Sequence, residues 1–229
     1  MADTFVDDIV SLVTLMQGGI ALHAGCVEVN GFRFCIFGDS GFGKSTTVTS
    51  LTRLGCDFLS DDVTTGRIVN DQFEVHSSFP YVRLWDSSAD RVIPKYEGIS
   101  IAGKPGKKRY RVTDWTSEKQ TWRRLDLAYL MRPFPSLEAE SVTNGSKMGM
   151  YITLIKSIMM GFALTAREWE IVQQTCYHIS SWTRFHLVSY AIKIERAEKV
   201  AELIMRHVAQ TQTESNNMRG SHELCLRSV

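Results

Sequence analysis

The sequence has almost no net charge and no long apolar run. Its 26 lysines and arginines balance 25 aspartates and glutamates, so the formal net charge is +1. This balance argues against a nucleic-acid-binding protein that works through a strongly basic whole-domain field. The longest nearly apolar stretch, residues 158–166, is far shorter than the roughly 20 residues of a membrane-spanning helix. The acidic N-terminus lacks the basic start of a secretory signal. We therefore expect neither a nucleic-acid nor a membrane partner.

Cysteine is scarce, and its arrangement excludes two further classes of protein. The five cysteines are odd in number and widely spaced, and no two of them form a CxxC motif; they are Cys26, Cys35, Cys56, Cys176 and Cys225. Such a pattern is typical of reduced thiols, and not of a disulfide framework or a zinc site. We expect buried apolar cysteines in a cytoplasmic protein.

What is present is the composition of a globular protein, with 44% hydrophobic and 22% charged residues over 229 positions. Hydrophobic periodicity and turn signals predict helices over residues 3–17, 44–54, 87–93, 146–160, 165–180 and 196–210. They predict strands over residues 24–29, 32–37, 57–60, 66–69, 72–76, 125–131 and 185–192, with an irregular stretch over 96–121. This mixture indicates an α/β fold in one domain, residues 1–210, followed by a polar tail, residues 211–229, that we expect to be disordered.

One motif carries most of the chemical information. Gly38-x-x-x-x-Gly43-Lys44-Ser45 matches the P-loop pattern in full, between an apolar strand and an amphipathic helix. Its backbone N–H groups and the following helix N-terminus suit a phosphate, with Lys44 at the β- and γ-phosphates and Ser45 on Mg²⁺. The sequence therefore predicts ATP and Mg²⁺ as cofactors. The expected binding residues are Gly38, Asp39, Ser40, Gly41, Phe42, Gly43, Lys44, Ser45 and Thr46.

Two carboxylates follow the motif. Asp61 and Asp62 end a short strand one helix and one turn after Lys44, and neighbouring strands of an α/β sheet bring their carboxyl ends together. One carboxylate can hold Mg²⁺, and the other can accept a proton from an attacking hydroxyl. His23, just before the first hairpin, is a third candidate, although a lone histidine in an apolar setting is more often a packing residue.

The segment from His23 to Asp62 resembles, in order and spacing, the kinase domain of HPr kinase/phosphorylase. The matching residues are His23-Ala-Gly-Cys-Val, Asn30-Gly31, Gly38-Asp-Ser-Gly-Phe-Gly-Lys-Ser45, Leu54-Gly55 and Leu59-Ser-Asp61-Asp62. The resemblance implies a nucleotide-binding core of the phosphoenolpyruvate carboxykinase type, a mixed sheet with flanking helices. It also implies Asp62 as general base, Asp61 at the metal and phosphate, and His23 as support for the transferred phosphate.

The sequence departs from the bifunctional members of that family in two ways. Thr46-Thr47 stands where they have Glu-Thr, and neither their N-terminal domain nor their downstream signature rich in Glu, Arg and Gly is found. These departures argue against the phosphorylase reaction and against HPr as substrate. The chain is similar in size to stand-alone kinases found with lasso-peptide biosynthesis genes, which phosphorylate the C-terminal serine of a precursor peptide.

The acceptor stays open at this stage. The sequence favours an ATP-dependent serine kinase acting on a peptide or protein, with a small-molecule kinase, an HPr(Ser) kinase and an ATPase or switch as alternatives. A guanine-nucleotide switch is disfavoured because no Asn-Lys-x-Asp motif occurs. A basic cluster around Lys108, Arg109 and Arg111, together with Arg83, is either a solvated surface or a clamp for an anionic acceptor. Self-association is a further open question.

Overall fold

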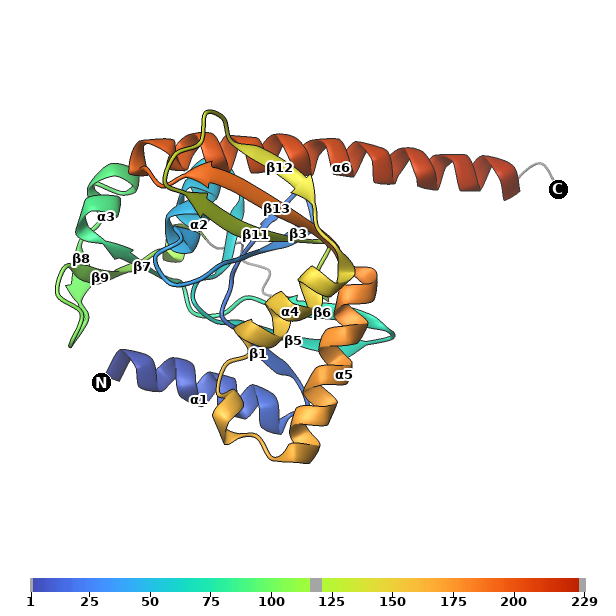
Figure 1. Cartoon of the computed structure of the whole chain (residues 1–229), viewed down its shortest axis with the longest axis horizontal. Helices are drawn as coiled ribbons and strands as arrows, with labels where there is room; N and C mark the ends of the chain where they lie inside the picture. The colour runs from blue at the N-terminus through green and yellow to red at the C-terminus, as the bar shows by residue number, and fades with distance from the viewer. Residues whose placement is uncertain (1, 116–120, 227–229) are drawn as a thin grey trace.

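A six-stranded mixed sheet forms the centre of the molecule (Figure 1). The computed structural model describes residues 2–115 and 121–226. The strands lie in the order β12 (Ser141–Asn144), β13 (Arg184–Ala191), β11 (Leu127–Phe134), β3 (Phe32–Phe37), β2 (Gly25–Val29) and β4 (Asp57–Ser60). β11 runs parallel to both β3 and β13, and the other pairs are antiparallel. The predicted α/β class with a mixed sheet is confirmed.

The sheet separates two apolar cores because side chains alternate along each strand. In β3, Phe34 and Ile36 face a core closed by α2 (Lys44–Arg53) and α6 (Ala197–Leu226). Cys35 and Phe37 face the opposite core. That second core is closed by α4, α5 and a four-stranded sheet; these elements are α4 (Lys147–Ser157), α5 (Ala166–Trp182), β1 (Ile20–Leu22), β5 (Thr64–Val69), β6 (Gln72–His76) and β10 (Arg123–Arg124). Cys26, Cys35, Cys56 and Cys176 are free and buried, as expected.

A third, three-stranded sheet lies beside α2, at the left of Figure 1. It contains β7 (Tyr81–Trp85), β9 (Lys107–Arg111) and β8 (Gly98–Ser100), and α3 (Asp86–Val92) follows β7. The prediction of irregular structure over residues 96–121 is therefore wrong for β8 and β9, while residues 116–120 lie outside the described residues. β9 carries four basic residues in five positions, so its pairing with β7 is invisible in the hydrophobic pattern.

Two element ends differ from the prediction. β11 continues through Pro133 to Phe134, where the sequence indicated that a proline would close it. The proline is tolerated because β11 pairs with β3 only as far as Leu130, so beyond that residue one side of the strand is an edge. Short 3₁₀ turns at Thr113–Trp115, Gly161–Ala163 and Ile194–Arg196 complete the chain.

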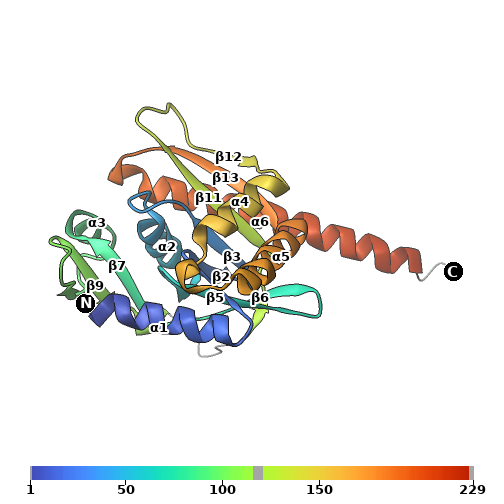
Figure 2. The same cartoon turned by 60° about the horizontal axis from the view of Figure 1, so that its bottom comes forward.

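The two terminal helices lie on the outside of the molecule (Figures 1 and 2). α1 (Ala2–Met16) matches its prediction, but α6 continues from Ala197 to Leu226 instead of ending at residue 210. The segment expected to be disordered begins with a packed residue, Thr211, and with Gln212, whose Nε2 donates to the carbonyl oxygen of Val29 at 3.2 Å. These contacts hold the helix past the point where its apolar periodicity fades. The end of α6 projects beyond the sheet.

Candidate functional site

The glycine-rich loop joins the end of β3 to the start of α2. Gly41 and Gly43 have φ angles of 85° and 76°, in the left-handed region that is strained for residues with a Cβ atom. Gly43 caps α2 without a side-chain hydrogen bond, and the first bond of the helix runs from Thr47 N to Gly43 O at 2.8 Å. The first-turn N–H groups of α2 are thus left for an external acceptor. The loop is shaped for an anion.

Lys44 lies folded into this loop. Its Nζ donates to the carbonyl oxygens of Gly38 at 2.7 Å and Asp39 at 3.2 Å, and its side chain is buried. Burial lowers the pKa of Lys44, and the carboxylates of Asp62 and Asp61 partly oppose that effect. The two carbonyl partners are neutral, so an anion entering the loop would be a stronger partner for the ammonium group.

A tyrosine from a distant strand braces the loop. The hydroxyl of Tyr190, in β13, donates to the carbonyl oxygen of Phe42. Tyr190 is buried, and burial raises its pKa, so the hydroxyl stays protonated as a donor. Sequence analysis missed this residue because a tyrosine in an apolar strand carries no signal of the loop that it reaches.

The turn after β4 sends its two aspartates in different directions. Asp62 has a φ of 66°, and Val63 N donates to Asp61 O at 2.8 Å across it. This tight turn places Asp62 in a cavity together with the loop, whereas Asp61 lines a smaller neighbouring cavity. Asp61 Oδ2 accepts from the backbone N–H of Arg83 at 3.0 Å. The predicted pair is therefore beside the loop, but only Asp62 lines the cavity that contains it.

The two carboxyl groups also differ in protonation. Burial, with a further contribution from the Asp62 charge, raises the pKa of Asp61 to about 7. Burial alone would raise the pKa of Asp62 too, but Lys107, Arg83 and His23 outweigh it and hold that pKa below its usual value. Asp62 is consequently a carboxylate at neutral pH, whereas burial favours the protonated form of Asp61. Asp62 is therefore the better placed of the two to accept a proton in the loop cavity.

Asp61 also has the one feature of the turn that fits a cation. Its Oδ1 is buried and has no hydrogen-bond partner within residues 2–115 and 121–226. The Ser45 hydroxyl is close enough to Asp61 to lower its pKa. An orphaned carboxylate oxygen beside a hydroxyl suits Mg²⁺. Over the same residues no group of three or more His, Cys, Asp or Glu side chains could hold a metal, so a bound ligand would have to supply the remaining oxygens.

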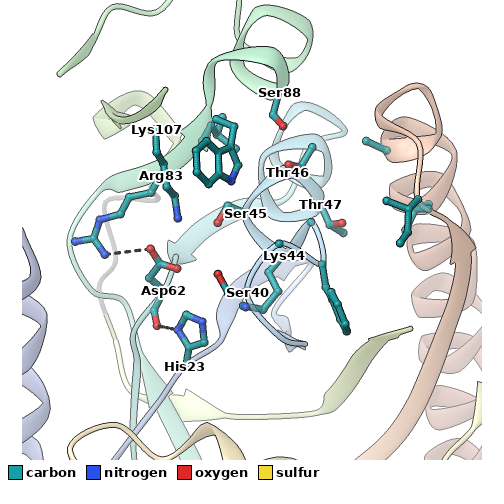
Figure 3. Close-up of a pocket in the computed structure, with 18 of the residues that line it drawn as sticks. His23, Ser40, Lys44, Ser45, Thr46, Thr47, Asp62, Arg83, Ser88 and Lys107 are labelled. Carbon is teal, nitrogen blue, oxygen red and sulfur yellow. Dashed lines mark hydrogen bonds and ion pairs between the residues drawn. The ribbon is translucent and has the colours of Figure 1, made fainter. Parts of the chain in front are cut away.

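His23 lies between β1 and β2, with its ring next to Asp62 and Lys44 (Figure 3). Its Nδ1 is 3.0 Å from the carbonyl oxygen of Asp62. A carbonyl can only accept, so Nδ1 carries the proton and Nε2 keeps its lone pair. Burial, followed by the Lys44 charge, lowers the pKa of His23. His23 is therefore a neutral imidazole within the predicted site.

Arg83 ties three elements together at the edge of the cavity. From β7, its Nη1 donates to Asp62 Oδ2 at 3.0 Å and also to Asp7 Oδ2 of α1. Figure 3 shows the Asp62 carboxylate between this guanidinium and the loop. The structure thus places Arg83, which the sequence left open between a solvated surface and an anion clamp, at the edge of the loop cavity. Asp7 was missed, because nothing in α1 marks one of its aspartates as different from the others.

The basic cluster is divided by the strand that carries it. Lys107, at the start of β9, lines the larger cavity together with Lys104. Lys108 pairs with Asp86 at 2.9 Å, and the Arg109 guanidinium lies 4.7 Å from the ring centre of Tyr81, in the smaller cavity. Arg111 is exposed and lines neither cavity. Of the four predicted substrate residues, only Arg83 reaches the loop cavity.

The cavity that contains the loop has a volume of about 350 Å³. The loop, Asp62, His23 and the cations described above supply polar lining. The β13–α6 connection and the start of α6 add Lys193 and three apolar residues, which are Ile192, Ala197 and Val200. A ligand with a charged and an apolar part would match this lining.

Comparisons with known proteins give little further information. No protein-family model and no curated protein matches the chain. Among solved structures, the Hpr(Ser) kinase/phosphatase from Coxiella burnetii is similar at 12% sequence identity and a TM-score of 0.42, over 84% of this chain and 98% of that one. This likeness is too distant to identify the function. Separately, no helix among the described residues is long and apolar enough to cross a membrane.

Proposed function

We propose that this chain is an ATP-dependent serine kinase with a P-loop core of the HPr kinase type, acting on a peptide or protein. One observation carries the proposal: an ionised Asp62 faces the same cavity as the glycine-rich loop and Lys44. An anion-binding loop alone would fit any nucleotide-binding protein. A proton acceptor beside it is what transfer to a hydroxyl requires.

On the donor side, the N–H groups of residues 40–46 would surround the phosphates, and Lys44 would move from its two carbonyl partners to the β- and γ-phosphates. Ser45 and Asp61 would hold Mg²⁺, which supplies charge neutralisation on the phosphates. The raised pKa of Asp61 supports this role, because a cation beside its orphaned oxygen would favour the ionised form.

On the acceptor side, a serine hydroxyl would attack the γ-phosphorus. The new O–P bond forms, the bond from phosphorus to the β–γ bridging oxygen breaks, and the serine proton passes to Asp62. Arg83 would hold the Asp62 carboxylate in place through its hydrogen bond at 3.0 Å. The negative charge of the phosphate would favour protonation of His23, whose Nε2 could then donate to a phosphate oxygen.

For the acceptor itself, we propose a peptide whose serine lies beside a free C-terminal carboxylate, as in a lasso-peptide precursor. Lys104, Lys107 and Arg83 support this choice because they add positive charge to the lining of the loop cavity. A free amino acid would present the same carboxylate, so small-molecule kinase activity is the alternative to exclude.

The test is transfer of ³²P from γ-labelled ATP to a peptide ending in serine, to free serine, or to water, in parallel reactions. We expect label in the peptide and much less in the other two products. The same peptide with its C-terminus amidated is the control for recognition of the carboxylate. Release of phosphate alone, with no acceptor labelled, would contradict the proposal and indicate an ATPase.

A further inference from the structure

Helix α1 carries most of its apolar side chains on the outside, while Leu15 packs against the second core. Six of them are exposed and form one stripe; they are Phe5, Val6, Ile9, Leu12, Val13 and Met16. The side chain turned fully inward is Ser11, which is completely buried, and Asp7 also faces the body through its pairing with Arg83. An ordinary surface helix has the opposite orientation. In both views α1 runs along the outside of the molecule (Figures 1 and 2).

The stripe is large for a monomeric protein. Phe5 is 64% and Met16 80% exposed, and the other four side chains are 40–45% exposed. At about 150–200 Å² per fully exposed side chain, the stripe presents roughly 500 Å² of apolar surface. Two such surfaces in contact would bury about 1,000 Å² before any polar rim is added, which is the size at which specific interfaces begin. A second copy of the chain would therefore satisfy the area requirement.

The spacing of the stripe makes it complementary to itself. Phe5, Ile9, Leu12 and Met16 are separated by four, three and four residues, so the series reads the same in both directions. In an antiparallel pair of helices, Phe5 of one copy would lie opposite Met16 of the other, and Ile9 opposite Leu12. A parallel pair would instead bring the two copies of Asp8 to the same end of the interface, where like charges repel.

We propose that the chain forms a two-fold dimer through antiparallel contact of the α1 stripes. The inner side of the same helix holds Asp7 against Arg83, which in turn binds Asp62. Contact with a second copy on the outer side would thus hold α1 in place and keep Arg83 bound to Asp62. The dimer itself does not depend on the proposed kinase activity, but a role for the dimer in positioning Asp62 does.

The first test is sedimentation velocity of the full chain over a range of concentrations up to about 100 µM. We expect a species of twice the 25.9 kDa chain mass, and a monomer for the variant Ile9→Glu/Leu12→Glu. The control is Ile99→Glu, which places the same charge on an exposed apolar residue of β8 and should leave the dimer intact. A monomeric wild-type protein would overturn the proposal, and the stripe would then have to be a contact surface for a different protein. A dimeric double variant would overturn it as well.

The second test concerns orientation and uses a Cys225→Ser background, so that the remaining native cysteines are the four buried ones. Under a mild oxidant, Phe5→Cys protein mixed with Met16→Cys protein should form a disulfide-linked dimer, and neither protein should do so alone. Crosslinking of Phe5→Cys with itself would show a parallel pair and overturn the proposed geometry. If the protein is a dimer but transfers no ³²P to any acceptor, the proposed function is contradicted and the proposed dimer is not.

Discussion

The two sides of the loop cavity are built in different ways. One side comes from a continuous stretch, residues 23–62, in which His23, the loop and the Asp61–Asp62 turn follow each other along adjacent strands. The other side is assembled from α1, β7, β9 and the β13–α6 connection, which are far apart in the sequence. The first side depends on local backbone geometry, and the second on side chains brought together by packing. Changes to the first should therefore stop the reaction, whereas changes to the second should adjust it.

Lys44→Ala should have the largest effect. It removes the buried cation that is folded into the glycine-rich loop, and we expect phosphoryl transfer to fall by about 10³-fold or more. The thermal melting temperature should change little, because Lys44 bonds only to two loop carbonyls. Near-normal transfer by a folded variant would contradict the role of the loop.

Asp62→Asn should come next. The amide keeps the size of the carboxylate but cannot accept the serine proton, so we expect kcat to fall by about 10²–10⁴-fold with ATP binding retained. Asp61→Asn is the matched control, and its transfer rate should fall less at saturating Mg²⁺. The reverse order of severity would exchange the two roles. Single-turnover transfer and ATP titrations measure both effects.

Asp61 should also make the free energy of unfolding depend on pH. The folded pKa of Asp61, about 7, lies above the unfolded value of 3.8, so the folded state binds more protons between these values. The stability that Asp61 contributes is present below about pH 4 and is lost as the pH rises through about 7. Asp61→Asn should thus be more stable than wild type at neutral pH, by up to about 4 kcal/mol, and equal to it in acid. Denaturant unfolding across this pH range would show a constant difference if Asp61 were an ordinary exposed carboxylate.

The assembled side should show smaller and more selective effects. Removing Lys104 and Lys107 with alanine substitutions should raise the peptide KM by about tenfold and change the ATP KM less. Lys108→Ala/Arg111→Ala removes the same charge from outside the loop cavity and should change neither KM by more than about twofold. The difference in peptide KM between the two double variants should become smaller at high salt, because salt screens exposed charges. Equal effects of the two pairs would indicate a diffuse field instead of a defined contact.

Tyr190→Phe should have the smallest effect, because it removes one hydrogen bond to the loop, the one to the carbonyl oxygen of Phe42, and no charge. We expect ATP binding to weaken by about three- to tenfold, the usual value of a single hydrogen bond. Tyr129→Phe is the matched control, since its hydroxyl bonds to His207 Nδ1 at 2.8 Å and does not touch the loop. Titration with a fluorescent nucleotide would compare the affinities of the two variants. Equal affinities would show that the Tyr190 hydrogen bond does not support nucleotide binding by the loop.

The sequence by itself determined the continuous side of the site. The hairpin marked by Asn30-Gly31, the glycine-rich loop and the strand before Asp61 all depend on local conformational preferences, which a short segment carries wherever it folds. The Asn70-Asp71 hairpin, outside this stretch, was predicted in the same way. The mixed α/β class followed from the same signals. The separate directions of Asp61 and Asp62 could not be predicted, because they depend on a left-handed residue that is not glycine.

Only the tertiary structure decided the rest. β9 is a strand because β7 pairs with it, although its residues are almost all basic. Asp7 and Tyr190 reach the site from distant parts of the chain. α6 continues past residue 210, where Thr211 is buried and Gln212 donates to the carbonyl oxygen of Val29 in the sheet. The apolar stripe of α1 predicted a helix correctly, but not that its apolar side would face outward. Hydrophobic periodicity identifies the apolar face of a helix but not the surface that this face contacts, because that contact depends on tertiary packing.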